Sequence, residues 1–178
     1  MRVISGRYKG RNIKGFDIIG TRPTMDRVKE SLFAIINPYL KDAKVLDLFA
    51  GSGNLGIEAL SNGSTCAYFI DNNQIAINTI KENIKSINIT EEVHINKMDY
   101  KVALNYFHDN KIKFNIILLD PPYKDNILND ILLLIKEYDL LFDNGIVVLE
   151  YEKDNIKYNN YELIKNKKYG SKNVMILK

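Results

Sequence analysis

The sequence predicts an α/β fold in which helices wind doubly around a mostly parallel sheet that ends in a C-terminal antiparallel hairpin. Three observations favour this fold. Short apolar runs typical of buried strands alternate with amphipathic segments typical of helices. A glycine-rich turn, residues 51–56, directly follows the first of these runs. The last two strand-like segments are joined by residues 165–172, too few for a crossover helix, so they should pair antiparallel.

The individual elements follow from apolar spacing and from turn residues. The first helix has Val28, Leu32, Ile35 and Ile36 on one face, and Thr24 or a neighbour should cap it. Before it, residues 3–5 and 12–14 could pair as a hairpin. After it, the expected order is strand 44–49, helix from 53, strand 66–70, helix 73–87, strand near 93, helix 102–108, strand 114–119, helix 127–138, strand 145–150, and the hairpin of 161–164 with 173–177.

Length and composition predict one domain over residues 1–178, with a basic hairpin extension (1–20) on a core (21–178). We see no apolar run long enough for a membrane span and no signal-peptide pattern, which predicts a cytoplasmic protein without a membrane partner. Cys66 is the one cysteine and should be a small buried hydrophobe. His94 and His108 are far apart, and no Cys/His spacing predicts a metal site.

Charge is distributed unevenly along the chain. Residues 1–41 carry nine basic and three acidic side chains, whereas the whole chain has a net charge of only +3. Such asymmetry indicates a polyanionic partner, although a solubilising arm would look similar. The sequence therefore predicts phosphate contacts near the N-terminus, with the ring of Tyr8 as a stacking surface. The predicted RNA-binding residues are Arg7, Lys9, Arg11, Arg22 and Arg27.

The most specific motif is Asp120-Pro121-Pro122-Tyr123, which ends the apolar strand 114–119. Two prolines make this loop stiff, and the carboxyl ends of parallel strands are where α/β folds bind ligands. The Tyr123 ring could stack on a flat substrate, while Asp120 and the Pro121 carbonyl accept hydrogen bonds from its amino group. The motif predicts catalysis on an aromatic exocyclic amine, against the alternative of a plain strand-ending turn.

The glycine turn predicts a nucleotide site. Asp47, Phe49, Gly51, Ser52 and Gly53 form the end of a strand and the tight turn that opens a helix. This pattern fits a dinucleotide, whose pyrophosphate binds the helix N-terminus, and it also fits S-adenosyl-L-methionine. Asp47 favours the second ligand, because a carboxylate repels a pyrophosphate but attracts a cationic ammonium and sulfonium.

Two further acids end predicted strands. Asp71 lies 20 residues beyond Gly51, the spacing expected for an acid that binds ribose hydroxyls, and Asn72 follows it. Asp71 could equally cap the next helix. Asp99 could accept a hydrogen bond from an adenine amino group, or it could cap the helix that starts near Tyr100. We predict all three residues in the cofactor site.

Together these motifs resemble the class I S-adenosylmethionine-dependent methyltransferases, with residues 47–53 similar to their first cofactor motif and residues 120–123 to their amino-methylating motif. Residues 21–33 and 55–60 narrow the resemblance to the RsmD-type 16S rRNA guanine-N2 methyltransferases. The resemblance implies a Rossmann-like methyltransferase sheet and methyl transfer to the N2 amine of guanine 966. It also implies a monomer without metal that acts on 16S rRNA in a 30S subunit or an assembly intermediate. The alternatives are an adenine-N6 methyltransferase on RNA or DNA and a non-catalytic nucleotide- or RNA-binding protein.

Overall fold

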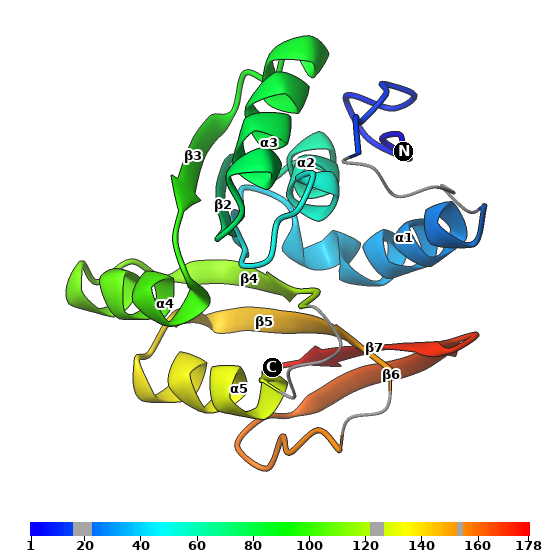
Figure 1. Ribbon diagram of the computed structural model, residues 1–178. Coiled ribbons are helices and arrows are strands. Elements are labelled where there is room, and N and C mark those ends of the chain that lie inside the picture. Colours follow the sequence, from blue (N-terminus) through cyan, green and yellow to red (C-terminus); the bar gives the residue numbers. More distant parts are fainter. Residues whose placement is uncertain (16–22, 122–126, 153–154) are drawn as a thin grey trace.

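The computed structural model describes residues 1–15, 23–121, 127–152 and 155–178, with side chains of the first helix from Asp26 onward. The described strands form one seven-stranded sheet in the order β3-β2-β1-β4-β5-β7-β6 (Figure 1). Neighbouring strands from β3 to β5 are parallel, whereas β7 is antiparallel to both β5 and β6. The predicted mostly parallel sheet with a terminal antiparallel hairpin is confirmed.

The elements alternate as the apolar spacing predicts. The strands are β1 (Lys44–Asp47), β2 (Cys66–Asp71), β3 (Glu92–Lys97), β4 (Phe114–Leu119), β5 (Leu141–Tyr151), β6 (Leu163–Tyr169) and β7 (Lys172–Leu177). The helices are α1 (Pro23–Ile36), the short 3-10 helix η1 (Asn37–Tyr39), α2 (Asn54–Ser61), α3 (Gln74–Ile87), α4 (Tyr100–Asp109) and α5 (Leu128–Glu137). β5 begins several residues earlier than predicted, because the polar segment before Gly145 also pairs with β4 through Leu141 and Phe114.

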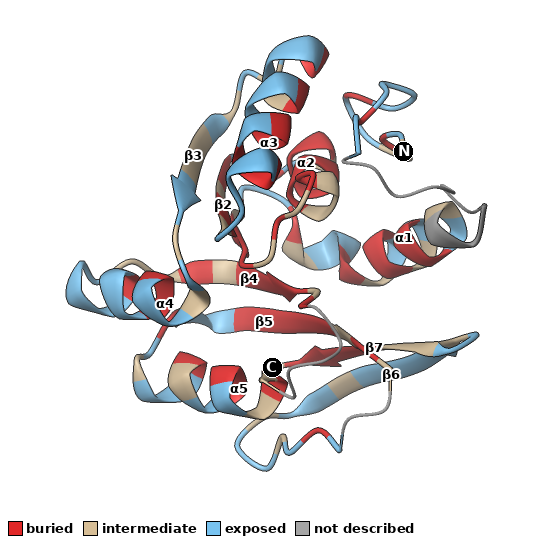
Figure 2. Ribbon diagram, viewed as in Figure 1, coloured by how far each residue is buried: buried red, intermediate tan, exposed pale blue. Residues whose placement is uncertain are grey.

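Helices cover both faces of the sheet. α1, α2 and α3 lie on one face together with the N-terminal segment, and α4 and α5 lie on the other (Figure 1). The central strands β1 and β4 are almost wholly buried (Figure 2). Their side chains alternate between the two faces, so Ile116 and Leu118 pack with α1, whereas Ile117 and Leu119 pack with α4 and α5. This alternation determines which strand-end residues share a face.

Two helix starts differ in detail from the sequence-based expectation. α1 begins at Pro23, so Thr24 lies within its first turn, and the neighbour that precedes the helix lies outside the described residues. α3 is capped by Asn73, whose side chain accepts a hydrogen bond from the Ile75 amide at 2.8 Å. Asp71 is therefore not the cap of that helix, and its carboxylate has other partners.

The N-terminal segment, residues 1–15, pairs antiparallel, but through one bridge between Arg2 and Asn12 rather than the predicted pairing of residues 3–5 with 12–14. The contacts that hold it are to the protein body. On α2, the Glu58 carboxylate is fully buried and accepts hydrogen bonds from the amides of Ile4 and Ser5 at 2.9 and 2.8 Å. The buried Lys29 ammonium pairs with Glu58 at 2.8 Å and donates to the Arg2 carbonyl.

The turn of this segment lies against the end of α2. Arg7 donates its amide hydrogen to the Ser61 carbonyl at 2.7 Å. Gly6 has φ +78°, and a Cβ atom there would lie 1.8 Å from the same carbonyl oxygen. Only glycine allows so close an approach in that backbone conformation. The N-terminal segment is thus a closely packed part of the protein surface rather than a separate arm.

Candidate functional site

Four acids end strands at the carboxyl edge of the sheet. Asp47, Asp71 and Glu150 are at or near the ends of β1, β2 and β5, and Asp120 directly follows β4. Strand pairing aligns Asp47 with Leu118, and Leu119 with Leu149. Asp120 and Glu150 are the next residues after this last pair, so they lie side by side. Open α/β sheets bind their ligands at this edge. We therefore locate the candidate site there.

The glycine turn connects β1 to α2 in a conformation that needs glycine. Gly51 and Gly53 have φ +54° and +80°, and Gly53 is the N-cap of α2. Gly56 lies against β2, where a Cβ atom would come within 2.3 Å of the Phe69 ring. The turn brings backbone amide hydrogens to the carboxyl edge, as in nucleotide-binding βαβ units.

Asp47 is buried beneath this turn. One of its carboxylate oxygens accepts a hydrogen bond from the Gly56 amide at 2.9 Å. Burial raises the pKa of Asp47 to about 7, the Gly56 hydrogen bond lowers it in part, and the nearby charge of Asp71 raises it further. A cationic group bound beside Asp47 would favour its ionised form.

Asp71 links β2 to the glycine turn. Its two carboxylate oxygens accept hydrogen bonds from the Gly51 and Asn73 amides, each at 2.9 Å. A carboxylate has about four acceptor sites, so both oxygens can still accept hydrogen bonds from ligand hydroxyls. Asn72 is exposed beside it. Asp71 is therefore joined to the glycine turn by a hydrogen bond, and its predicted ribose-binding role stays a prediction.

The region after β3 adds an aromatic pair and a second acid. The exposed Asp99 caps α4 by accepting a hydrogen bond from the Lys101 amide at 2.9 Å, so the predicted cap is observed. Phe49 and Tyr100 are in ring contact, with centroids 5.8 Å apart. Ser52 is buried, and its carbonyl accepts a hydrogen bond from the Asn83 amide group at 2.9 Å. Phe49 follows β1 and Asp99 follows β3, two strands that are separated in the sheet by β2.

Asp120 lies at the centre of the carboxyl edge and is half-buried, and Pro121 is buried. Loss of contact with water raises the pKa of Asp120 to about 7, and the nearby Glu150 and Asp47 raise it further, whereas Lys172 lowers it. Pro122 and Tyr123 lie outside the described residues, so the predicted stacking role of Tyr123 stays a prediction.

Sequence reasoning missed two residues next to Asp120. The Glu150 carboxyl lies beside the Asp120 side chain on the neighbouring strand, and the Lys172 ammonium is ion-paired with Glu150. Glu150 ends an apolar strand just as Asp47 and Asp71 do, so the same sequence pattern could have identified it. Lys172 has no such pattern, because only the antiparallel pairing of β7 with β5 brings its start to this edge.

The predicted RNA-binding residues that the structure describes are exposed, but they differ in whether an acid pairs with them. Lys9, Arg11 and Arg27 are exposed, and Arg22 lies outside the described residues. The exposed Arg7 guanidinium pairs with Glu91 at 3.1 Å. The prediction that Tyr8 offers a stacking surface is wrong. Its ring is buried and its hydroxyl donates to Glu91 at 2.6 Å, because the segment packs against the chain before β3.

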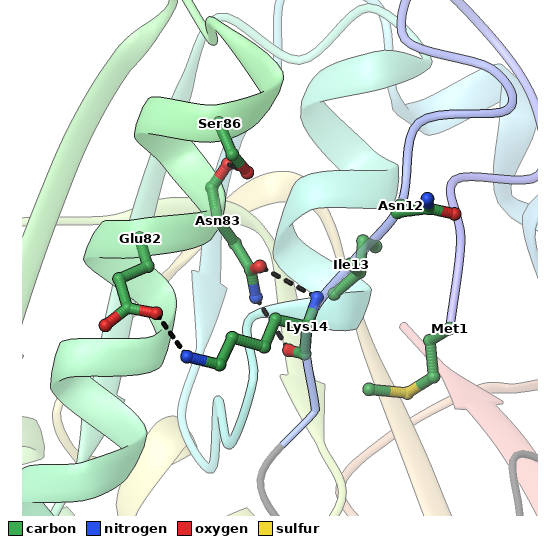
Figure 3. Close-up of a pocket in the computed structure, with 7 residues that line it drawn as sticks. All are labelled: Met1, Asn12, Ile13, Lys14, Glu82, Asn83 and Ser86. Atoms are coloured by element: carbon green, nitrogen blue, oxygen red, sulfur yellow. Dashed lines mark hydrogen bonds and ion pairs between the residues drawn. The ribbon is translucent and has the colours of Figure 1, made fainter.

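A pocket of about 410 Å³ lies between the N-terminal segment and α3 (Figure 3). Asn83 accepts a hydrogen bond from the Lys14 amide and donates to the Lys14 carbonyl, and the Lys14 ammonium pairs with Glu82 at 2.7 Å. None of the strand-end acids lines this pocket. It is therefore a junction that fastens the N-terminal segment to α3, and it is separate from the candidate site.

Strand pairing also brings together three potential metal ligands that sequence spacing did not indicate. One ligand atom each from Cys66, Glu92 and His94 lies within 4.8 Å of the others. Glu92 and His94 already contact one another at 2.6 Å, and burial raises the pKa of the Cys66 thiol to about 11, which disfavours the thiolate a metal needs. We assign no metal to this group.

Within the described residues, the helices are too short or too polar to cross a membrane.

Known proteins are similar to this chain in sequence and in fold. The family model described as "Conserved hypothetical protein 95" matches residues 1–178. "Putative rRNA methyltransferase YlbH" of Bacillus subtilis is 45% identical over 154 residues, covering 86% of this chain and 84% of that protein. "Ribosomal RNA small subunit methyltransferase D" of Haemophilus influenzae is 34% identical over 177 residues, covering 96% and 89%.

A solved structure agrees with the fold at full length. "Putative methyltransferase yhhF from Escherichia coli" superimposes with a TM-score of 0.84 at 26% identity, covering 99% of this chain and 96% of that one. The motif resemblance, the matched family model and the shared architecture lead to one conclusion. The chain belongs to the family described as Conserved hypothetical protein 95, the RsmD family that its sequence motifs predict.

Proposed function

We propose that this protein uses S-adenosyl-L-methionine to methylate the exocyclic N2 amine of a guanine in small-subunit ribosomal RNA. The observation that carries this proposal is the pairing of the Asp47–Asp71 glycine turn with Asp120 at one edge of the sheet. The printed names of the relatives support an rRNA substrate. The basic N-terminal segment supports contact with RNA.

The residues of the glycine turn fit this cofactor. Asp47 is an acid whose pKa is raised by burial, and a cationic methionine ammonium would stabilise its charge. Asp71 keeps acceptor sites for ribose hydroxyls beside the Gly51 amide. Asn72, Asp99 and the Phe49 ring would border the nucleoside, and Ser52 and Gly53 complete the turn. When bound, the cofactor supplies an electrophilic methyl group.

The residues of the Asp120 motif would hold the acceptor base. Asp120 and the Pro121 carbonyl accept hydrogen bonds from the amine, which favours a pyramidal nitrogen whose lone pair is less delocalised into the ring and points at the electrophile. Tyr123 stacks on the base after it has left its helix or stack, at a cost of a few kcal/mol. Positioning and polar complementarity supply most of the acceleration. The proton then leaves the methylated amine for Asp120 or water.

The deciding experiment is transfer of a labelled methyl group to RNA. The protein is incubated with labelled cofactor and undermethylated 30S subunits or naked 16S rRNA, and the labelled nucleoside is identified. N2-methylguanosine supports the proposal, and comparison of the two substrates identifies the form of the RNA. N6-methyladenosine would replace guanine by adenine as the target. Bound cofactor without label in any nucleic acid would contradict catalysis.

Asp71→Ala should weaken cofactor binding. Loss of hydrogen bonds between hydroxyls and a carboxylate costs about 1.5–3 kcal/mol, which corresponds to a roughly tenfold to hundredfold weaker affinity. Isothermal titration calorimetry with the cofactor measures this change. Asp109→Ala is the control, because Asp109 is an exposed acid whose side chain bonds Asn105 on α4. Equal affinities of the Asp71 variant and the unmodified protein would contradict a ribose-binding role.

The double substitution of Lys9 and Arg11 by alanine should weaken RNA binding in a salt-dependent way. Both side chains are exposed. Loss of two phosphate contacts on single-stranded RNA should reduce the slope of log affinity against log salt by about 1.4. Fluorescence anisotropy at several salt concentrations measures the slope. A double alanine variant of Lys113 and Lys136 removes the same charge elsewhere. An equal slope change in both variants would contradict a specific role of the N-terminal segment.

A further inference from the structure

The residues around Asp120 form a line of charged groups on one face of the sheet. Alternation along the strands places Asp47 with Val45, Asp120 with Leu118, Glu150 with Val148, and Lys172 with Val174. Val45, Leu118, Val148 and Val174 all belong to the core packed by α1. The four charged side chains therefore share the α1 face at the carboxyl edge.

The contacts within this line are specific. Leu119 is paired with Leu149, so the Asp120 and Glu150 carboxyl groups are neighbours across β4 and β5, and Lys172 donates to Glu150. The charge of Glu150 raises the pKa of Asp120, and the charge of Lys172 lowers it. Burial opposes the charged form of Lys172, but its hydrogen bond and proximity to Glu150 raise the Lys172 pKa overall.

We propose that Glu150 and Lys172 are positioning residues that orient the Asp120 carboxyl and set its charge for the acceptor amine. The negative charge of Glu150 favours the protonated form of Asp120, and the ionised form of Asp120 accepts from the amine. Lys172 fixes Glu150 and offsets its charge. This inference rests on the proposed function, because it assigns Asp120 to the amine. Neither residue needs to touch the substrate.

The two positioning residues act on Asp120 in opposite directions. The negative charges that face Asp120 in the described structure are Glu150 and Asp47, and the positive charge is Lys172. Ionised Asp120 can accept two hydrogen bonds or take the proton of the methylated amine, in which case an N–H bond breaks as an O–H bond forms. Turnover should therefore rise with pH as Asp120 loses its proton, near its pKa of about 7.

Two substitutions should shift the pH at which turnover rises in opposite directions. Glu150→Gln removes a negative neighbour and should shift the titration of Asp120 to lower pH by about 1 unit or more. Lys172→Met removes the positive neighbour and should shift it to higher pH by a similar amount. Lys172→Arg keeps the charge and should restore the original titration. A residue with only a structural role would lower activity at all pH values without moving the rise.

The experiment has two readouts on the whole protein. Carboxyl ¹³C NMR of aspartate-labelled protein, with the Asp120 signal assigned from Asp120→Asn, follows the titration without any substrate. The pH dependence of the single-turnover rate of methyl transfer, at saturating cofactor and RNA, reports the titration of the same group during the reaction. The matched controls are Asp139→Asn and Lys113→Met, which remove the charges of a separate exposed ion pair. Lys172→Gln replaces Lys172→Met if that variant does not fold.

The outcomes separate this inference from the proposed function. Opposite shifts of the Asp120 titration, with none in the controls, support the inference. Shifts in the same direction, or no shift in either variant, overturn it even if the protein methylates RNA normally. Opposite shifts in NMR together with no methyl transfer by the unmodified protein would keep the charge relation but overturn the assignment of Asp120 to a catalytic amine site.

Discussion

Asp120→Ala should reduce methyl transfer by about 10²–10³-fold while cofactor affinity stays within about twofold. Asp120 follows the end of β4, whereas the proposed cofactor groups, Asp47 and Asp71, belong to β1 and β2. The variant loses the acceptor that orients the amine and stabilises the charge developing on it. Single-turnover kinetics with labelled cofactor measures the rate, and calorimetry measures the affinity.

The control for this variant is Asp109→Ala, which removes an exposed acid from α4 and should keep the normal rate. Asp120→Asn is informative in addition, because it keeps one acceptor oxygen but cannot take a proton. A large loss in the alanine variant with a small loss in the asparagine variant would assign Asp120 to orientation alone. Equal loss of turnover and cofactor affinity in the alanine variant would assign Asp120 to the cofactor site instead.

Glu58→Ala should destabilise the protein by about 3–5 kcal/mol, because it breaks a buried ion pair and leaves Lys29 buried without its carboxylate. The variant also removes the acceptor of the Ile4 and Ser5 amides and of the Ser5 hydroxyl, at 2.8–2.9 Å. The N-terminal segment should detach, so trypsin should cleave after Arg7, Lys9 or Arg11 faster than in the unmodified protein. Urea denaturation gives the free energy of unfolding.

Glu82→Ala is the matched control, because Glu82 also pairs with a lysine of the N-terminal segment, Lys14, but at the exposed surface. An exposed pair contributes less than about 1 kcal/mol. A difference of a few kcal/mol between the two variants would identify burial as the cause. Similar stabilities and similar trypsin cleavage in both would contradict the anchoring role of Glu58.

The sheet could be predicted from local patterns because its strands are short apolar runs and its helices show clear spacing. The strand 114–119 is predicted and observed with the same bounds. Asp47 and Asp71 were found for the same reason, since an acid that ends a buried strand is visible in the sequence. The start of α3 is not fixed by the sequence, because Asp71, Asn72 and Asn73 are all residues that commonly cap helices, and the structure selects Asn73.

The remaining contacts depend on residues far apart in the chain, which single-sequence patterns do not reveal. Tyr8 lies in a polar, basic stretch, yet its hydroxyl is hydrogen-bonded to Thr90 and Glu91, 82 and 83 residues away. Nothing in the sequence distinguishes Glu58 from other acids on helices. Its role comes from contacts with Ile4 and Lys29, which lie far from it in the chain. Lys172 approaches Asp120 only because β7 runs opposite to β5. Tertiary packing determines these roles.

The strand order has a consequence for synthesis on the ribosome. β7 lies between β5 and β6, although β6 is made first. β6 therefore gains its partner in the sheet only when the residues of β7 emerge and pair with both β5 and β6. Asp47, Asp120 and Glu150 are made before this insertion, whereas Lys172 arrives with it. A nascent chain lacking β7 would carry the acids without their cation, so the electrostatics of the site depend on the insertion of β7.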